Sequence, residues 1–357
     1  MGIKKLFYVV TTIPSTLIFF RGQLAYLSDS FEIVAISSDK AALEKFGEME
    51  GIETHYIPMV RSISLLHDFK SLIKFISFFR KRRPDIVHGN TPKASFISMC
   101  AAWITRIPVR IYMCHGLRYQ GCTGWKRKLL INMERISCWC ATAVVCVSYG
   151  LQNQMISDRV CPKKKLRIIR NGSVNGIDMN WYDRDRIKVS PLIRKQAGIP
   201  DQNLVFLFVG RIVRDKGIKE LVTAFCRLEK QYNDVSLLLV GAYENLDPID
   251  MAIKETIDND PNIRLAGRQS DVKPFYGLAD VLVLPSYREG FGKVLIEAGA
   301  MKLPCITTDI IGCNEIIVNG QNGLIIPKQD ADALHEAMKY LIDIRRKEWK
   351  WHRNPVK

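Results

Sequence analysis

The sequence predicts an α/β protein made of two doubly wound, Rossmann-like domains. Short apolar runs rich in Val, Ile and Leu alternate with amphipathic stretches along the chain. This alternation is typical of a parallel sheet covered by helices on both faces. The runs form two series, separated by a polar segment rich in Asn and Asp at residues 171–185. A length of 357 residues also favours two domains.

Each series supplies the strands of one expected sheet. In the first series we expect strands at 6–11, 33–37, 54–58, 86–88, 109–114, 143–148 and 166–169. In the second we expect them at 204–209, 236–240, 263–266, 281–284, 305–307 and 324–326. The polar segment is then a linker. The expected domains are residues 1–185 and 186–335, followed by a C-terminal helix over 336–357.

The net charge of +16 is placed unevenly along the chain. Residues 1–190 hold 29 Lys and Arg against 14 Asp and Glu, whereas residues 191–357 hold 23 against 22. A basic first half favours an anionic partner, such as a membrane surface, a phosphate-bearing acceptor or nucleic acid. Because no RNA-binding aromatic motif accompanies the charge, nucleic acid is not expected as a partner.

The remaining composition is that of an ordinary globular protein, with 47% hydrophobic and 25% charged residues. No apolar run approaches the roughly 20 residues that a membrane-spanning helix needs. The run at 6–10 is expected to be a buried first strand and not a signal peptide. Ten cysteines without a repeated Cys-x2-Cys spacing predict reduced thiols, as in the cytosol, and no metal site.

The segment SYREGFGKVLIE at residues 286–297 carries the clearest functional signal. It follows an apolar run and opens a helix-like run, with Gly290 and Gly292 at the junction, where a backbone can approach a ligand closely. A helix N-terminus offers N–H groups and a positive dipole end to an anion such as a diphosphate. Glu289 precedes the helix and Glu297 lies within it, so two carboxylates can accept hydrogen bonds from hydroxyls. The pattern predicts a site for a sugar nucleotide.

A second turn supplies cations for the same ligand. Gly210 ends a strand-like run, Arg211 follows it, and Lys216 stands before the next helix. Arg can bridge two phosphate oxygens and Lys acts as a point charge. Alone, the pattern favours an exposed pair on a solvated turn; together with residues 286–297 it favours a phosphate clamp.

These blocks resemble the donor half of the family 4 glycosyltransferases. The Glu-x7-Glu pattern of Glu289 and Glu297 is followed by AGAMKLP at 298–304, IGCNE at 311–315 and NGQNGLIIP at 319–327, and preceded by VGRIVRDKG at 209–217. The resemblance implies a GT-B architecture, in which the N-terminal domain binds the acceptor and the C-terminal domain binds the donor, with the ligands in a cleft between the carboxyl ends of the strands. It also implies that the last helix crosses back to the first domain, here through residues 347–351.

The resemblance further implies a role for each matching residue. Arg211 and Lys216 would bind the donor diphosphate, Glu297 the ribose hydroxyls and Glu289 the transferred sugar. The backbone N–H groups of Phe291, Gly292 and Lys293 would hold phosphate oxygens. Arg268 would lie near the nucleobase, although a purely structural turn explains that residue as well.

In the first half, Met113-Cys-His115-Gly ends an expected strand, and the resemblance implies that His115 faces the sugar. His88, at the end of the neighbouring strand, is a weaker candidate. The chain departs from the common family pattern after its first strand, because residues 11–16 contain no glycine pair. The resemblance therefore does not carry the acceptor contacts of the family's first loop over to this chain.

Apolar residues recur at helical spacing in residues 61–83, and the segment ends in Arg80, Lys81, Arg82 and Arg83. A basic helix with aromatic residues can lie on an anionic membrane and place a lipid-linked acceptor. A core helix whose cations stabilise its C-terminus explains the pattern as well. Both alternatives stay open.

The sequence thus predicts a retaining glycosyltransferase that moves a hexose or N-acetylhexosamine from a nucleotide donor, most simply a UDP-sugar, to a saccharide acceptor. A polyprenyl-diphosphate-linked acceptor in bacterial capsule or O-antigen assembly is expected, with the protein in the cytoplasm and peripheral at the inner face of the plasma membrane. No metal or other cofactor is expected. The alternatives are a sugar-nucleotide epimerase of the same fold and a non-catalytic basic binding module.

Overall fold

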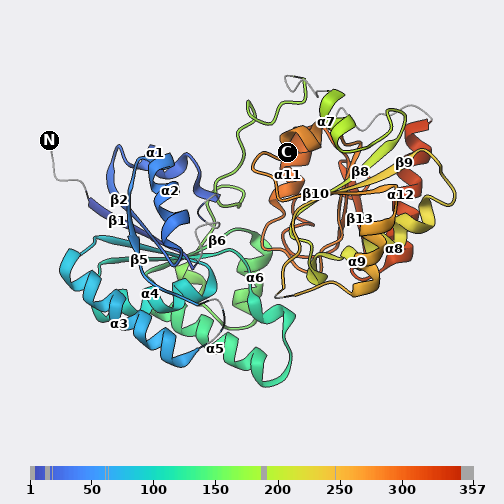
Figure 1. Ribbon diagram of the computed structural model, residues 1–357. Coiled ribbons are helices and arrows are strands. Elements are labelled where there is room, and N and C mark those ends of the chain that lie inside the picture. Colours follow the sequence, from blue (N-terminus) through green and yellow to red (C-terminus); the bar gives the residue numbers. More distant parts are fainter. Residues whose placement is uncertain are drawn as a thin grey trace. The chain divides into compact units, whose positions relative to one another are not determined.

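The computed structural model describes residues 5–12, 17, 19–60, 62, 64–185, 191–245 and 247–346. It divides into two compact units, Met1–Gly176 and Ile177–Lys357, each built around one parallel sheet (Figure 1). Along the chain, the boundary between Gly176 and Ile177 falls within the polar segment that the sequence marks as a linker.

Unit 1 contains a seven-stranded sheet in the order β3-β2-β1-β4-β5-β6-β7, with every neighbouring pair parallel. The strand order reverses between β1 and β4. Loops that leave the carboxyl ends of strands at such a reversal are the usual place for a ligand. The strands are β1 (Lys5–Val10), β2 (Phe31–Ser37), β3 (Glu53–Tyr56), β4 (Ile86–Asn90), β5 (Val109–Cys114), β6 (Ala143–Cys146) and β7 (Leu166–Arg167).

Helices cover both faces of this sheet. Figure 1 shows α1 and α2 on one side, and α3, α4 and α5 side by side on the other. The helices are α1 (Gln23–Leu27), α2 (Lys40–Glu50), α3 (Leu65–Arg82), α4 (Pro92–Ile104), α5 (Gly124–Cys140) and α6 (Tyr149–Ser157), with short 3₁₀ turns at Arg118–Gly121 and Lys163–Lys165.

Unit 2 repeats the doubly wound plan with a six-stranded parallel sheet in the order β10-β9-β8-β11-β12-β13, which reverses between β8 and β11. Its strands are β8 (Leu204–Val209), β9 (Val235–Val240), β10 (Ile263–Gly267), β11 (Val281–Leu284), β12 (Cys305–Thr308) and β13 (Gly323–Ile326). Its helices are α7 (Pro191–Gln196), α8 (Ile218–Leu228), α9 (Met251–Asn259), α10 (Lys273–Leu278), α11 (Lys293–Ala300) and α12 (Ala331–Arg346), with a 3₁₀ turn at Arg214–Lys216.

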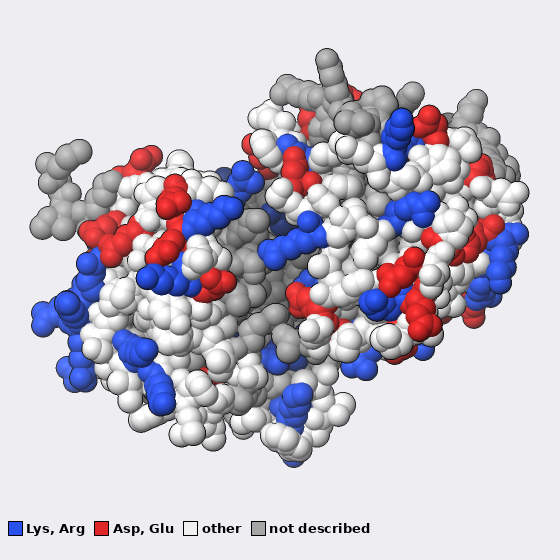
Figure 2. Space-filling view, viewed as in Figure 1, with Lys and Arg blue, Asp and Glu red and all other residues white. Residues whose placement is uncertain are grey.

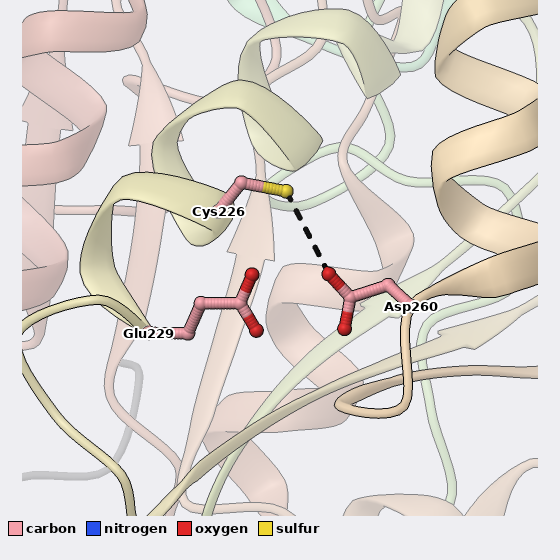
Figure 3. A group of neighbouring side chains, drawn as sticks. All are labelled: Cys226, Glu229 and Asp260. Atoms are coloured by element: carbon pink, nitrogen blue, oxygen red, sulfur yellow. Dashed lines mark hydrogen bonds between the residues drawn. The ribbon is translucent and has the colours of Figure 1, made fainter.

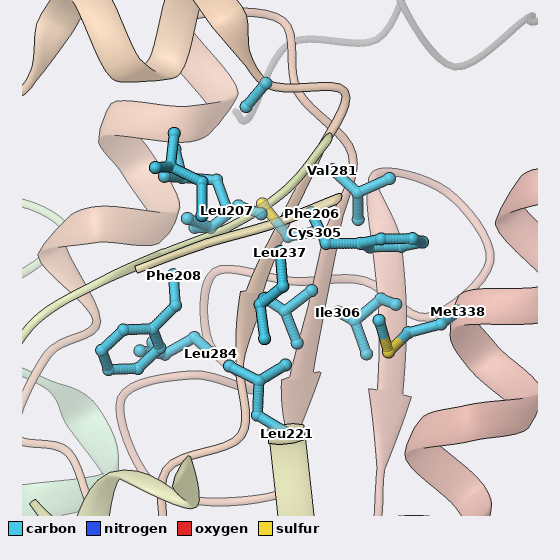
Figure 4. Packing of buried hydrophobic residues seen from close by; sticks show 14 of the residues in the cluster. Phe206, Leu207, Phe208, Leu221, Leu237, Val281, Leu284, Cys305, Ile306 and Met338 are labelled. Atoms are coloured by element: carbon cyan, nitrogen blue, oxygen red, sulfur yellow. The ribbon is translucent and has the colours of Figure 1, made fainter. Parts of the chain in front are cut away.

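The core of unit 2 explains why its strands are so apolar. Every residue of β8 and β9 is buried, because both faces of these strands are covered. Figure 4 shows Phe206 and Leu207 of β8 packed among side chains of β9, β11 and β12, with Leu221 from α8 and Met338 from α12 closing the cluster. This packing gives the loops at the sheet edge a rigid base.

All the expected strands are present, with small shifts at their ends. β7 ends at Arg167, two residues before its expected end, and the extended backbone is broken at Arg170, which has a φ of 50°. The expected boundary at residue 336 falls inside α12, which packs on α8. Residues 347–351, expected to cross back to the first domain, lie outside the described residues. Within the described part of the chain, no helix combines the length and apolar character needed to cross a bilayer.

Candidate functional site

In unit 2, the loops after β8 and β11 lie on the two sides of the strand-order reversal. A close backbone approach joins them: a Cβ added at Gly217 would lie 2.0 Å from the carbonyl oxygen of Pro285. Gly217 also has a φ of 69°, in the left-handed region that favours glycine. The chain therefore needs glycine here to bring Lys216 against the loop after β11.

The result is an ion pair between two predicted site residues. Lys216 Nζ donates to Glu289 Oε1, and the hydroxyl of Ser286 donates to the same oxygen over 2.8 Å. The side chains of Lys216 and Glu289 are only 15% and 14% exposed. Thr308, at the end of β12, donates to the Ser286 carbonyl and fixes this loop. Among the described contacts Glu289 Oε2 has no partner, so one carboxylate oxygen can accept a hydrogen bond from a ligand.

Arg211 is also held by a carboxylate. Its Nη1 lies 3.0 Å from Oε2 of Glu244, which follows β9. The Arg211 side chain remains 46% exposed. Both predicted phosphate-binding cations are thus positioned by carboxylates at the carboxyl edge of one sheet.

Glu297 is buried beneath this edge. Its Oε2 accepts a 2.9 Å hydrogen bond from the hydroxyl of Tyr276, and Lys293 Nζ lies 3.8 Å from its Oε1. Burial raises the pKa of Glu297, while Lys293 and Tyr276 oppose that rise. A buried carboxylate with a perturbed pKa is a frequent mark of a functional site.

At the start of α11, two of the three backbone N–H groups predicted to hold phosphate oxygens have acceptors within the chain. The N–H of Gly292 donates to the carbonyl of Gly312 over 3.0 Å, and the N–H of Lys293 donates to the carbonyl of Phe291 over 2.8 Å. Both amides are therefore occupied by the chain, because the turn folds back on itself and packs against Gly312. The N–H of Phe291 has no protein acceptor among the described residues and remains able to meet an anion.

Arg268 follows β10 directly and lies exposed at the same edge of the sheet, two strands from β8. Among the described residues it forms no hydrogen bond or ion pair with the other candidate side chains. Its predicted place near a nucleobase stays a prediction.

In unit 1, His115 follows β5 and is linked to His88 through Asn90. His115 Nε2 lies 3.0 Å from Asn90 Oδ1, and Asn90 Nδ2 lies 3.3 Å from His88 Nδ1 and 3.2 Å from the His88 carbonyl oxygen. That carbonyl can only accept, so Nδ2 faces it, Oδ1 faces His115, and Nε2 of His115 carries the proton. Burial lowers the pKa of His115 to about 4, and burial together with the nearby His115 lowers that of His88 to about 3. Both rings are neutral at neutral pH.

The four basic residues at the end of α3 are not equivalent. Arg82 pairs with Glu53 at 2.6 Å and with Glu32 at 3.9 Å, and it donates to the Tyr8 hydroxyl over 3.2 Å. Arg80 and Lys81 are exposed, and Figure 2 shows Lys and Arg side chains gathered where α3 lies. Arg82 therefore acts in packing, and the free positive charge lies mainly on its neighbours.

Two family models match the chain. The family described as "Glycosyltransferase Family 4" matches residues 24–173, and the one described as "Glycosyl transferases group 1" matches residues 189–355. Among curated proteins, the capsular polysaccharide biosynthesis glycosyltransferase CapM of Staphylococcus aureus is 36% identical over 341 residues, which cover 95% of this chain and 88% of CapM. The chain belongs to glycosyltransferase family 4.

Further comparisons agree with this assignment. The UDP-Gal:alpha-D-GlcNAc-diphosphoundecaprenol alpha-1,3-galactosyltransferase of Escherichia coli is 25% identical over 320 residues, covering 88% of this chain and 81% of the relative. The crystal structure of Anabaena HepE with UDP and glucose superposes with a TM-score of 0.81 at 18% identity, covering 98% of this chain and 93% of HepE. The enzyme is a hexosyltransferase with the GT-B fold.

A separate group of possible metal ligands lies elsewhere in the glycosyltransferase. Ligand atoms of Cys226, Glu229 and Asp260 all lie within 4.8 Å of one another (Figure 3). Cys226 and Glu229 lie at the C-terminal end of α8 and Asp260 precedes β10, so the group is at the opposite edge of the sheet from Lys216. Burial and the two carboxylates raise the pKa of the Cys226 thiol to about 11, and metal ligation requires the thiolate. The raised pKa therefore disfavours metal binding by this group, which lies apart from the site described above.

Three positions of the glycosyltransferase site escaped the sequence argument. Glu244 pairs with Arg211, Tyr276 bonds Glu297, and Asn90 links the two histidines. Tyr276 and Glu244 lie in stretches without a motif, and only the fold brings them to their partners. Asn90 stood beside His88 in the sequence, and its place at the end of a strand was the available signal.

Proposed function

We propose that this enzyme moves a hexose or N-acetylhexosamine from a UDP-sugar to a polyprenyl-diphosphate-linked saccharide, with retention at the anomeric carbon, in the assembly of a bacterial capsule or related surface glycan. The names of the Staphylococcus aureus and Escherichia coli relatives support the pathway and the acceptor. The UDP bound to Anabaena HepE supports the nucleotide. Retention rests on the family resemblance.

The observation that carries the proposal is the Lys216–Glu289 pair at the strand-order reversal of unit 2. When the sugar leaves, negative charge develops on the diphosphate. Lys216 and Arg211 stabilise that charge from the loop after β8. The N–H of Phe291, which has no acceptor among the described residues, stabilises it from the start of α11. Because Glu289 and Glu244 hold both cations before the donor arrives, little reorganisation is needed at the moment of reaction.

The two carboxylates of the motif bind different parts of the donor. Glu289 Oε2 accepts a hydrogen bond from a hydroxyl of the transferred sugar, since Oε1 is occupied by Lys216 and Ser286. Glu297 accepts hydrogen bonds from the ribose, oriented by Tyr276. The role of His115 toward the sugar, which the family resemblance implies, stays a prediction.

The reaction balances without any further reagent. The bond between the anomeric carbon and the diphosphate oxygen breaks, and the acceptor hydroxyl forms the new bond on the same face of the sugar. The hydroxyl proton passes to a phosphate oxygen of the departing UDP. With protein cations meeting the diphosphate, we expect activity to survive excess EDTA; complete loss with rescue by Mg²⁺ or Mn²⁺ would show that this assignment of the cations is wrong.

We place the enzyme at the cytoplasmic face of the plasma membrane, in peripheral contact with lipid. The basic first half and the exposed Arg80 and Lys81 support electrostatic attraction to anionic headgroups. Replacing both residues by Gln should weaken binding to anionic vesicles at low salt and leave donor hydrolysis unchanged.

The testing experiment is a donor screen on the purified enzyme. UDP-, GDP- and ADP-sugars are supplied with and without a diphosphate-linked saccharide acceptor, and released nucleotide and sugar products are measured. Acceptor-dependent release of UDP supports the proposal. An epimerised sugar formed without acceptor identifies an epimerase. Tight binding of a duplex oligonucleotide with no binding of UDP identifies a basic binding module.

A further inference from the structure

Helix α5 presents an apolar stripe to solvent. Trp125 is 76% exposed, Trp139 is 62% exposed, and Leu129 and Ile136 between them are exposed as well. Their spacings of four, seven and three residues place all four on one line of a helix with 3.6 residues per turn. The stripe runs the length of the 17-residue helix, about 25 Å.

The core does not account for this stripe. The buried side chains of α5 are Leu130, Ile131, Glu134, Ser137 and Cys138, on the opposite side of the helix, and Cys140 at its C-terminal end. The buried side is fixed to the sheet by a 2.6 Å hydrogen bond from Tyr112 of β5 to Glu134. The helix is therefore seated on the sheet without Trp125 or Trp139.

The stripe continues onto α4. Trp103 and Ile104, at the end of α4, are also exposed, and the rings of Trp103 and Trp139 have centroids 4.8 Å apart. We call the set Trp103, Ile104, Trp125, Leu129, Ile136 and Trp139 the tryptophan face. Single exposed apolar residues are ordinary, but a connected set across two helices marks an interaction surface.

The charges around the tryptophan face are basic. Lys126, Lys128 and Arg135 are exposed on α5, and Arg127 pairs with Asp158. The only acidic residue of α5 is the buried Glu134. Residues 64–140 hold 14 Lys and Arg against 3 Asp and Glu. A partner that fits the tryptophan face therefore presents an apolar layer next to an anionic layer.

We propose that the tryptophan face lies in the interface of an anionic bilayer, with α5 parallel to the membrane plane. Trp side chains favour the boundary between headgroups and acyl chains, and Lys and Arg beside them meet the anionic headgroups. This inference deepens the proposed function, because it rests on a lipid-linked acceptor for its purpose. α5 begins shortly after the loop that carries His115, so its Trp125 end brings the bilayer surface near that candidate residue.

Apolar insertion differs from purely electrostatic attraction in its response to salt. Charge-driven binding fades when the Debye length falls to roughly 3 Å at 1 M salt. Insertion of two or three Trp side chains persists. The enzyme should therefore keep part of its binding to anionic vesicles at 1 M NaCl, where Arg80 and Lys81 contribute little.

The test compares the full-length enzyme with a Trp125→Ser/Trp139→Ser double variant in co-sedimentation with phosphatidylglycerol-containing vesicles. We expect the partition coefficient of the double variant to fall by ~10-fold or more at both low and high salt. The matched control is Tyr26→Ser, since Tyr26 is 75% exposed on α1, on the other side of the same sheet. In the unaltered enzyme, lipids brominated near the headgroup should quench tryptophan fluorescence.

Several results would overturn the inference. Binding of the double variant equal to that of the unaltered enzyme would do so, as would absence of binding or quenching in the unaltered enzyme. If the unaltered enzyme is a dimer and the double variant a monomer without vesicle binding in either, the face belongs to a second copy.

Hydrolysis of a UDP-sugar is measured in parallel. Its presence with no vesicle binding defeats only the membrane inference, whereas its absence in the unaltered enzyme defeats the proposed function.

Discussion

Replacing Lys216 by Met should separate the structural and catalytic parts of the Lys216–Glu289 pair. Met keeps the length of the side chain but leaves Glu289 with only the Ser286 hydroxyl as a partner. Breaking a fully buried pair costs about 3–5 kcal/mol. Because both side chains remain about 15% exposed, we expect roughly 2 kcal/mol. At ~2–4 °C per kcal/mol for a domain of this size, the melting temperature should fall by about 4–8 °C.

Removing the second charge should restore stability without restoring the reaction. In the Lys216→Met/Glu289→Gln double variant no unpaired carboxylate remains, so most of the lost melting temperature should return. UDP release should stay ~10²-fold or more below that of the unaltered enzyme, the scale for loss of one group that stabilises developing charge. Thermal melts by circular dichroism and initial rates of acceptor-dependent UDP release decide the matter. If the single variant melts like the unaltered enzyme, the pair does not stabilise the fold. If the double variant has full activity, the pair is not needed for the reaction.

Three further predictions concern charges that the structure places. Arg211→Ala should slow UDP release by ~10²-fold, and Glu244→Gln should slow it by less, because Arg211 stays charged but loses the carboxylate that positions it; initial rates showing no loss for Glu244→Gln would contradict this. Glu297→Ala should chiefly weaken UDP binding and leave turnover at saturating donor less affected, so an unchanged Kd for UDP argues against a ribose contact. His115 and His88 have pKa values lowered to about 4 and about 3, so between pH 6.5 and 4 the unfolded state binds more protons than the folded state. Stability should therefore fall as the pH drops through this window, by up to ~1.4 kcal/mol per pH unit for each group, and His115→Gln should flatten the profile of melting temperature against pH.

The sequence predicted the central strands of unit 2 well because they are buried on both faces. Residues 204–209 form a continuous apolar run for that reason, and no helix period competes with it. The grouping of the candidate residues at one edge followed as well, since parallel strands place their following loops at the same edge. The resemblance supplied the residue types, and the fold brings Lys216 and Glu289 into contact although 73 positions separate them.

The details that the sequence could not predict depend on local backbone geometry and on distant partners. The amides of Gly292 and Lys293 are occupied because the turn closes on Gly312, which no motif reveals. Arg82 looked like its neighbours in a basic run, yet Glu53 and Tyr8 hold it. The sequence contains the helical spacing of the stripe from Trp125 to Trp139, but apolar residues also occur on the opposite side of α5. Only the packing shows which side faces the core.

The most direct test of the central claim follows the anomeric carbon through the reaction. The enzyme is supplied with the UDP-sugar that it hydrolyses and with a diphosphate-linked saccharide acceptor, and the product is analysed by NMR for the configuration of the new linkage. We expect acceptor-dependent transfer that retains the configuration of the donor, and we expect this transfer to be lost in the Lys216→Met/Glu289→Gln variant. A product of inverted configuration, or an epimerised sugar released without acceptor, would contradict it.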